Sequence, residues 1–224
     1  MFYKADYFIL EDAMLEDYYM EVEDGVIVGF SKNEPDSYEY LGEIVAPGLV
    51  DTHIHGYAGK DIMNAEEGAL DVISKGLLEC GVTSFLPTTL TDSKERTDAA
   101  LKRVAAEYKD VKGAKVRGIF LEGPFFTEKY KGAQNPNYMS DPKIDYLKEW
   151  KEISDGLVNK IAIAPERAGA EDFIKKANAM GVKVALGHSD ASFDEAVAAV
   201  DAGANIFVHT FNGMSGLHHR EPGM

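Results

Sequence analysis

The sequence predicts an α/β protein built on a parallel sheet and preceded by a short β-rich segment. From residue 46 onward an apolar strand, a polar turn and an amphipathic helix recur, which is typical of βα units on a parallel sheet. Six such strands favour either an open, doubly wound sheet or most of an eight-stranded barrel. No glycine-rich phosphate fingerprint follows the first strand, which disfavours a dinucleotide-binding fold.

The first 45 residues read as strands. Between Tyr18 and Phe30 the pattern predicts two short strands joined at Asp24 and Gly25, a dipeptide suited to a tight hairpin turn. We therefore expect a small β-structure at the start of the chain, followed by a separate α/β region from residue 46.

The α/β region divides into alternating strands and helices. The strands are predicted at 48–54, 82–88, 116–121, 160–164, 183–187 and 205–209. The helices are predicted at 65–79, 93–109, 142–154, 170–180 and 192–202. The last helix opens on Ser192 with Glu195 three residues later, the spacing of a capping box.

Composition narrows the class of protein. With 45% hydrophobic and 27% charged residues over 224 positions, the chain is expected to be globular. Its formal net charge of -15 opposes binding to nucleic acid or to anionic membranes. The start lacks the pattern of a signal peptide and the single cysteine, Cys80, cannot form an internal disulfide, so we expect a cytoplasmic protein. Cys80 itself is interpreted as a small apolar residue at a helix end.

Side chains able to bind a metal follow several of the predicted strands. In an α/β barrel the carboxyl ends of the strands carry the active site, so these side chains are expected to converge. His53 and His55 are two positions apart on an extended strand and therefore face the same side. Imidazole and carboxylate groups suit Zn²⁺ or Fe²⁺. The candidate metal ligands are His53, His55, Glu122, His188 and His209.

A second polar cluster, His218, His219 and Arg220, lies near the end of the chain. Three basic side chains in an acidic protein suit a phosphate or carboxylate, for which Arg220 offers a forked donor. A solvated loop is the alternative interpretation.

Six segments together resemble the N-acetylglucosamine-6-phosphate deacetylases of the amidohydrolase superfamily. They are "APGLVDTHIHG", "GVTSFLPTTLT", "GIFLEGPFFTEKYKGAQNP", "IAPE", "GHSDAS" and "HTFNGMSGLHHREPG", and they run in the family's order from residue 46 to the last residue. The resemblance implies an incomplete (β/α)8 TIM barrel, with about six of its eight strands, over residues 46–224. It also implies that residues 1–45 supply the N-terminal strands of a small β-sandwich.

The resemblance implies roles for individual residues. Glu122, His188 and His209 would hold the main divalent metal, and His53 and His55 would hold a second one in members that keep both. Ala133, Asn212, Gly213 and Arg220 would contact a sugar phosphate. Gln134 stands where many members have histidine.

The implied reaction is metal-dependent hydrolysis of N-acetyl-D-glucosamine 6-phosphate to D-glucosamine 6-phosphate and acetate. The galactosamine isomer is the alternative substrate, which the quoted segments do not exclude, and the resemblance implies a homodimer for the full-length form. The family's catalytic aspartate follows a later strand and is expected beyond Met224, so the chain is interpreted as the N-terminal part of such an enzyme. Of the nearby carboxylates, Asp51 and Asp190, the second is expected to cap the helix that follows it. A non-catalytic protein that binds metal or sugar phosphate remains the alternative.

Overall fold

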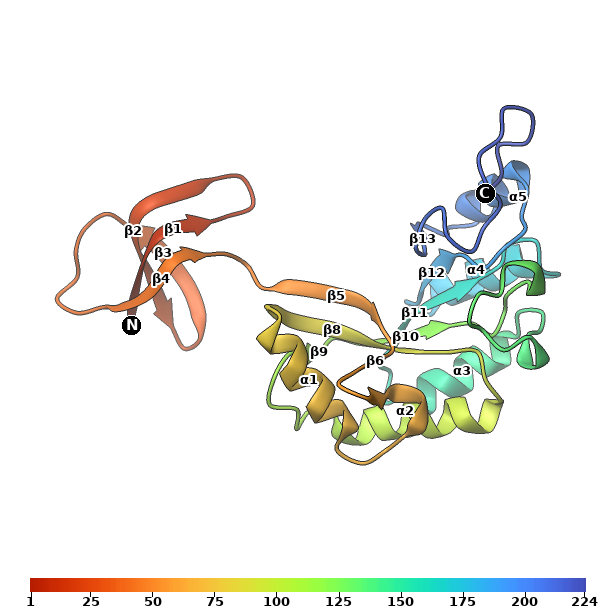
Figure 1. Cartoon of the computed structure of the whole chain (residues 1–224), viewed down its shortest axis with the longest axis horizontal. Helices are drawn as coiled ribbons and strands as arrows, with labels where there is room; N and C mark the ends of the chain where they lie inside the picture. Colours follow the sequence, from red (N-terminus) through yellow and green to blue (C-terminus); the bar gives the residue numbers. More distant parts are fainter. The chain divides into compact units, whose positions relative to one another are not determined.

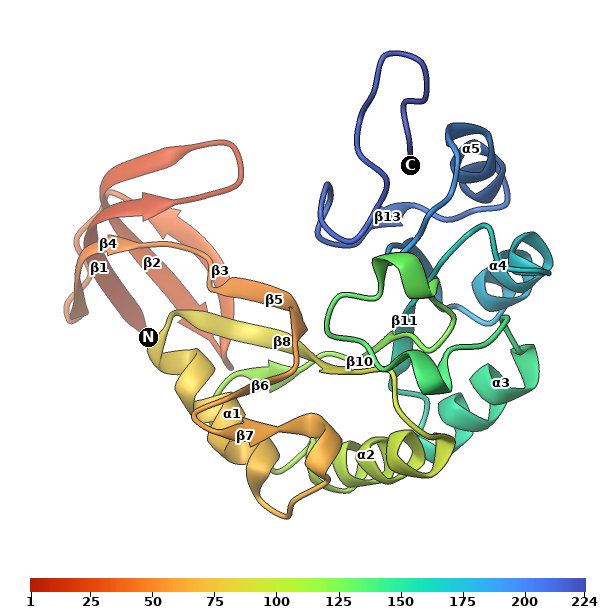
Figure 2. The ribbon, with the colours of Figure 1, turned by 45° about the vertical axis from the view of Figure 1, so that its right-hand side comes forward.

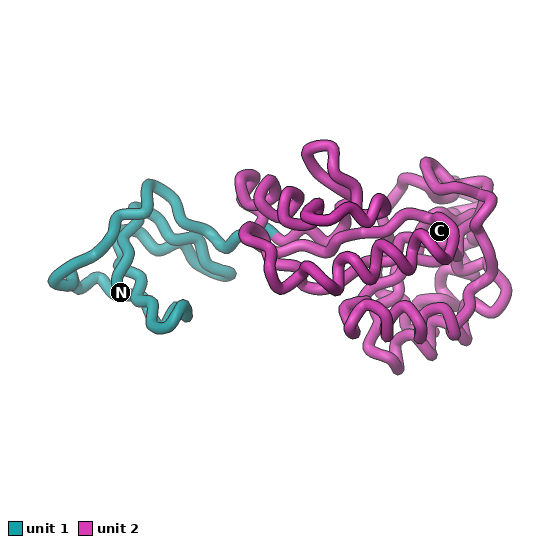
Figure 3. Tube along the Cα trace, turned by 90° about the horizontal axis from the view of Figure 1, so that it is seen from below, with its two compact units in different colours: residues 1–49 teal, residues 50–224 magenta.

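The computed structural model describes residues 1–224, which divide into two compact units, Met1–Leu49 and Val50–Met224 (Figure 3). The division falls four residues after the one predicted from the sequence, 1–45 and 46–224. Each unit has its own core and is described by itself.

The first unit is a four-stranded sheet (Figure 1). Its order is β3-β2-β1-β4, with β4 parallel to β1 and the other pairs antiparallel. Ala5, Phe8 and Met20 form its small core. The strands are β1 (Phe2–Ile9), β2 (Met14–Glu23), β3 (Val26–Ser31) and β4 (Glu39–Val45). That this sheet is part of a β-sandwich stays a prediction.

The predicted hairpin is confirmed. The strands β2 and β3 pair antiparallel across Asp24 and Gly25, whose φ angles are 49° and 77°. Two consecutive positive φ angles are what a tight turn between twisted strands requires, and Asp and Gly adopt them at low cost.

The second unit alternates strands and helices. Its main strands are β5 (Leu49–Ile54), β8 (Val82–Thr89), β10 (Ile119–Glu122), β11 (Val158–Ile163), β12 (Lys183–Leu186) and β13 (Ile206–Phe207). Its helices are α1 (Ala69–Glu79), α2 (Lys94–Glu107), α3 (Ile144–Ile153), α4 (Ala170–Ala179) and α5 (Phe193–Asp201). The shorter elements are β6 (Gly56–Tyr57), β7 (Lys60–Asp61), β9 (Lys115–Val116) and the 3-10 turns η1 (Ile62–Asn64), η2 (Glu128–Tyr130) and η3 (Pro136–Tyr138).

The six main strands form a curled half-barrel in the order β13-β12-β11-β10-β8-β5. Figure 2 shows α1 to α5 along the outer side of this sheet. A doubly wound sheet would carry helices on both faces. The incomplete barrel is therefore confirmed, and the doubly wound alternative is excluded.

Alternate residues of each strand face two different cores. On β10, Ile119 and Leu121 pack into the core beneath the helices, while Phe120 packs into the core inside the half-barrel. The inner core consists of Leu86, Phe120, Phe126, Ala162, Ala185 and Val208. Because side chains alternate along a strand, Glu122 faces the same side as Phe120. This alternation places a carboxylate inside the half-barrel.

Two predicted strands were wrong in detail. The strand predicted at 116–121 is broken into β9 and β10 at Gly118, whose φ is 151°. A Cβ there would lie 2.0 Å from the Asn159 amide nitrogen, so the break depends on glycine. The strand predicted at 205–209 ends at Phe207, which leaves His209 in the following turn.

The ends of α1 and α5 test the remaining local predictions. The capping box of α5 is confirmed, with both the Ser192 and the Glu195 side chains bonded to backbone N–H groups. The helix predicted from residue 65 begins only at Ala69, because the 3-10 turn η1 and a loop precede it. Cys80 does end α1, but it is exposed rather than packed as an apolar residue. No helix combines the length and apolar character needed to cross a bilayer.

We expect the 224-residue polypeptide to self-associate through the outer strands of the half-barrel. The strand β5 lies at one end of the sheet, and its Val50 side chain is 63% exposed. An exposed apolar edge is a template for pairing with another chain. We expect sedimentation velocity to show oligomers at micromolar concentration, reduced by Val50→Lys; a monodisperse monomer at all concentrations would refute this.

Candidate metal centre

The centre is built around the Glu122 carboxylate at the end of β10. Four histidine Nε2 atoms face it from three other segments of the half-barrel. His53 and His55, at the end of β5, lie 3.1 Å and 3.2 Å from its two oxygens. His188, after β12, and His209, after β13, lie 3.4 Å and 3.5 Å from Oε1. The carboxylate is almost fully buried, at 2% exposure.

These five side chains form two overlapping groups with the donor set of a metal site. One group is His53, His55 and Glu122, and the other is Glu122, His188 and His209; within each, the ligand atoms lie within 4.8 Å of one another. Glu122 is common to both, so its two oxygens could serve one ion each. Imidazole nitrogen with carboxylate oxygen is a ligand set for a divalent ion such as zinc.

Backbone carbonyls fix the tautomer of three of the rings. The Nδ1 atoms of His55, His188 and His209 lie 3.1, 2.8 and 2.7 Å from the carbonyl oxygens of Thr88, Tyr130 and Asn212. A carbonyl oxygen only accepts, so each Nδ1 must carry the proton and donate it. In a neutral ring with this tautomer Nε2 carries a lone pair and can bind a metal, whereas in a protonated ring Nε2 donates to Glu122.

The Nε2 atoms of His188 and His209 face each other at a distance that favours a cation between or on the two rings. These atoms are 3.1 Å apart. Because both Nδ1 atoms donate to carbonyls, two neutral rings would place lone pair against lone pair. Either a proton on one ring or a metal ion shared by both relieves this repulsion, and the anionic Glu122 beside them favours either cation.

The electrostatics of the group favour an ionised carboxylate among imidazoles. Burial disfavours the charged form of Glu122, but hydrogen bonds with His188, His53 and His55 outweigh it and hold the pKa of Glu122 well below its usual range. At His55, burial favours the neutral ring, but Glu122, the Thr88 carbonyl and Asp61 together outweigh burial and raise the pKa of His55. A permanently negative oxygen pair is what a dication requires.

The turns that carry His188 and His209 are strained. Their φ angles are 48° and 33°, in the left-handed region that costs a non-glycine residue about 1–3 kcal/mol. Gly213 makes the close approach possible, since a Cβ there would lie 3.1 Å from the His209 ring and 3.3 Å from Nδ1 of His188. Glu166 holds the first turn, accepting hydrogen bonds from Thr127 Oγ1, Ser189 Oγ and the Asp190 N–H.

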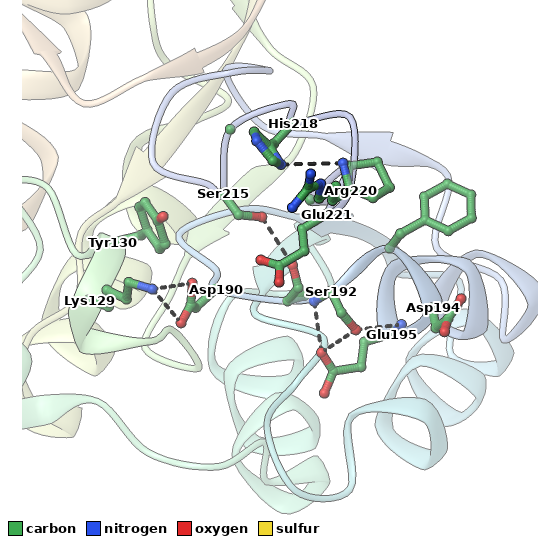
Figure 4. Close-up of a pocket in the computed structure, with 15 residues that line it drawn as sticks. Lys129, Tyr130, Asp190, Ser192, Asp194, Glu195, Ser215, His218, Arg220 and Glu221 are labelled. Carbon is green, nitrogen blue, oxygen red and sulfur yellow. Dashed lines mark hydrogen bonds and ion pairs between the residues drawn. The ribbon is translucent and has the colours of Figure 1, made fainter.

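A cavity of about 760 Å³ is lined by residues of η2, of the segment from Asp190 to Glu195 and of the segment from Ser215 to Gly223, and by none of the five candidate ligands. Tyr130 connects the cavity to the centre, because it lines the cavity and its carbonyl accepts from His188. Figure 4 shows His218 and Arg220 at the top of the cavity and the Lys129–Asp190 ion pair, with N–O distances of 2.8 and 2.9 Å, at its left. The lining therefore carries charges of both signs, since Asp190, Asp194, Glu195 and Glu221 line the cavity together with Arg220 and Lys129.

The remaining residues predicted for substrate contact lie apart from this lining. Arg220 lines the cavity, whereas Ala133, Asn212 and Gly213 do not. Gly213 instead packs against the two metal-candidate rings, and Ala133 is exposed next to the buried Gln134.

The predicted cap at Asp190 was wrong. Ser192 caps α5, and both Asp190 oxygens accept from Lys129. The other carboxylate considered for proton transfer, Asp51, accepts the backbone N–H of His53 at 2.9 Å. Each of the two carboxylates thus already has a partner.

The sequence pattern of the amidohydrolase family matches residues 44–221. This range is most of the chain and includes all five candidate ligands. The chain belongs to the amidohydrolase family. Members of this family generally depend on divalent metals, and the His/Glu group of this amidohydrolase is able to hold one.

Two curated relatives are similar to this amidohydrolase. An N-acetylglucosamine-6-phosphate deacetylase from Vibrio furnissii is 45% identical over 186 residues, covering 82% of this chain and 47% of the relative. An N-acetylgalactosamine-6-phosphate deacetylase from Escherichia coli O157:H7 is 39% identical over 222 residues, covering 99% of this chain and 59% of the relative. The chain thus spans about half the length of the relatives it matches.

Solved structures share the fold. The N-acetyl-D-glucosamine-6-phosphate deacetylase of Mycobacterium smegmatis superposes with a TM-score of 0.91 at 30% identity, covering all of this chain and 59% of that one. A mutant of the same enzyme, solved in complex with N-acetyl-D-glucosamine-6-phosphate, gives a TM-score of 0.89 at 30% identity and covers 58% of that chain.

Several residues that shape the amidohydrolase site were not assigned a role from the sequence. Glu166, in the "IAPE" segment, holds the His188 turn, and Gln134 donates to Glu122. Lys160 is buried inside the half-barrel, where its Nζ lies 3.9 Å from the centre of the Phe120 ring. The only sequence signal for these residues was their position in the quoted motifs or in a predicted strand, because their contacts join separate segments of the chain.

Zinc is expected to stabilise this amidohydrolase through the five ligands. An ion at 100 times its dissociation constant adds about 2.7 kcal/mol to the free energy of unfolding, or about 5–10 °C for a chain of this size. Differential scanning fluorimetry should show this rise for the wild type and for the control His219→Ala, which lies outside the group. The double variant His188→Ala, His209→Ala keeps only the group of His53, His55 and Glu122 and should show a smaller rise; an equal rise would show that His188 and His209 do not bind the ion.

Proposed function

We propose that this chain carries the metal centre and part of the substrate pocket of a deacetylase that hydrolyses N-acetyl-D-glucosamine 6-phosphate to D-glucosamine 6-phosphate and acetate. The observation that carries the proposal is the pair of facing Nε2 atoms of His188 and His209 beside Glu122. These three residues would hold the main ion, and His53 and His55, with Glu122, a second one. Zn²⁺ or Fe²⁺ suits this ligand set.

The ion, when bound, supplies a Lewis acid that activates water and polarises an amide carbonyl. The protein's own part is to hold the ligands rigidly. Backbone carbonyl groups fix the orientation of three of the imidazole rings. Because Glu122 is buried, water does not screen the attraction between its carboxylate and a bound cation.

Proton transfer is the one task that the described residues leave open. The leaving amine is too basic to depart as an anion, so an acid must protonate it. Asp190 is paired with Lys129 and Asp51 accepts from the backbone of His53, so the proposal assigns this task to neither.

Arg220 is proposed to bind the phosphate of a phosphorylated substrate. The guanidinium of Arg220 can bind two phosphate oxygens at once, whereas Lys129 is already paired with Asp190. Ala133, Asn212 and Gly213 are proposed to contact the sugar between phosphate and metal. The two deacetylases at 45% and 39% identity, both named for hexosamine 6-phosphates, support this class of substrate.

Two alternatives follow from specific observations. The relative that matches 99% of this chain is named for the galactosamine isomer, so N-acetylgalactosamine 6-phosphate is the second candidate substrate. The partnered state of Asp51 and Asp190 favours, as a third candidate, a protein that binds metal and sugar phosphate without turnover.

Acetate release tests the proposal. The zinc-loaded chain is expected to release acetate from N-acetylglucosamine 6-phosphate above a His188→Ala, His209→Ala blank. The rate should be about 10²–10⁴-fold below that of an enzyme with a positioned proton carrier. Faster release from the galactosamine isomer would favour the second candidate, and saturable binding without acetate would favour the third.

Arg220 is expected to matter for binding. Charge-assisted hydrogen bonds are worth about 1.5–3 kcal/mol, so Arg220→Met should weaken sugar-phosphate binding by about 10–100-fold in isothermal titration calorimetry. The matched control is Arg117→Met, because Arg117 bonds Ser84 at the opposite end of the strands. Equal losses in both variants would contradict a specific phosphate contact.

A further inference from the structure

Gln134 occupies a buried position between the Glu122 carboxylate and the loop after β8. Its exposure is 3%. Its Nε2 donates to Glu122 Oε2 at 2.7 Å, and its Oε1 accepts the backbone N–H of Thr91, also at 2.7 Å. Both ends of the amide are thus engaged.

The orientation of this amide is forced by its partners. The Thr91 N–H can only donate, so the amide oxygen must face it. The amide nitrogen then faces the ionised Glu122, which can only accept. One side chain therefore connects the backbone of a neighbouring loop to the residue shared by both metal groups.

This contact distinguishes the two oxygens of Glu122. Oε2 receives the Gln134 hydrogen bond and lies 3.2 Å from His55. Oε1 is left to His53, His188 and His209, at 3.1, 3.4 and 3.5 Å. Without the donor, the carboxylate is free to rotate towards one histidine pair and away from the other.

We propose that Gln134 is a positioning residue, which orients the Glu122 carboxylate for metal binding. The inference rests on the metal centre of the proposed function and adds to it a residue outside the ligand set. Groups that orient metal ligands typically contribute 10–100-fold to metal affinity.

The test is the zinc dissociation constant, measured by competition with a chromophoric chelator. Gln134→Met keeps an unbranched side chain of similar length but removes both hydrogen bonds. We expect its zinc dissociation constant to rise about 10–100-fold, with metal-free unfolding within a few degrees of the wild type. Asn137→Ala, on the same loop and exposed, is the matched control and should bind zinc as the wild type does.

A dissociation constant within twofold of the wild type in Gln134→Met would overturn the inference. If that variant does not fold, Gln134→Glu decides the question. Its carboxylate still accepts from Thr91 but repels Glu122, so weaker zinc binding supports the inference, and unchanged or tighter binding overturns it. A wild-type chain that binds no zinc would overturn the proposed metal centre itself, and the inference with it, whereas normal wild-type binding with an unaffected Gln134→Met overturns the inference alone.

Discussion

The structure depends on one buried anion, the Glu122 carboxylate inside the half-barrel. An ionised carboxylate removed from water costs several kcal/mol unless it is compensated. Here the compensation comes from four imidazoles and one amide, brought together from separate segments of the sheet. The carbonyl partners of the histidines and the buried position of Gln134 follow from this requirement.

The backbone is distorted where the anion requires it. His188 and His209 adopt left-handed φ angles that ordinary side chains avoid. The Glu166 carboxylate and the close approach of Gly213 hold these turns in place. Strain that is maintained by a network of side-chain hydrogen bonds indicates a site in which geometry has been favoured over stability.

The sequence predicted the features that arise from local pattern. The repeating strands and helices predicted the parallel sheet, and the histidines at strand ends predicted convergence, because alternation and strand direction fix where such side chains point. The sequence did not predict three other features: the break at Gly118, the ion pair of Asp190 and the contacts of Gln134. The first two depend on partners 41 and 61 residues away, Asn159 and Lys129, and Gln134 joins Glu122, 12 residues away, to Thr91, 43 residues away.

The central claim is that Glu122 and its histidines form a divalent metal site. The most direct measurement is an anomalous difference map from a zinc-soaked crystal, recorded on both sides of the zinc absorption edge. The account predicts a peak about 2.0–2.2 Å from the Nε2 atoms of His188 and His209 and from a Glu122 oxygen. Full density for all five side chains, with no peak among them and zinc bound elsewhere, would contradict it.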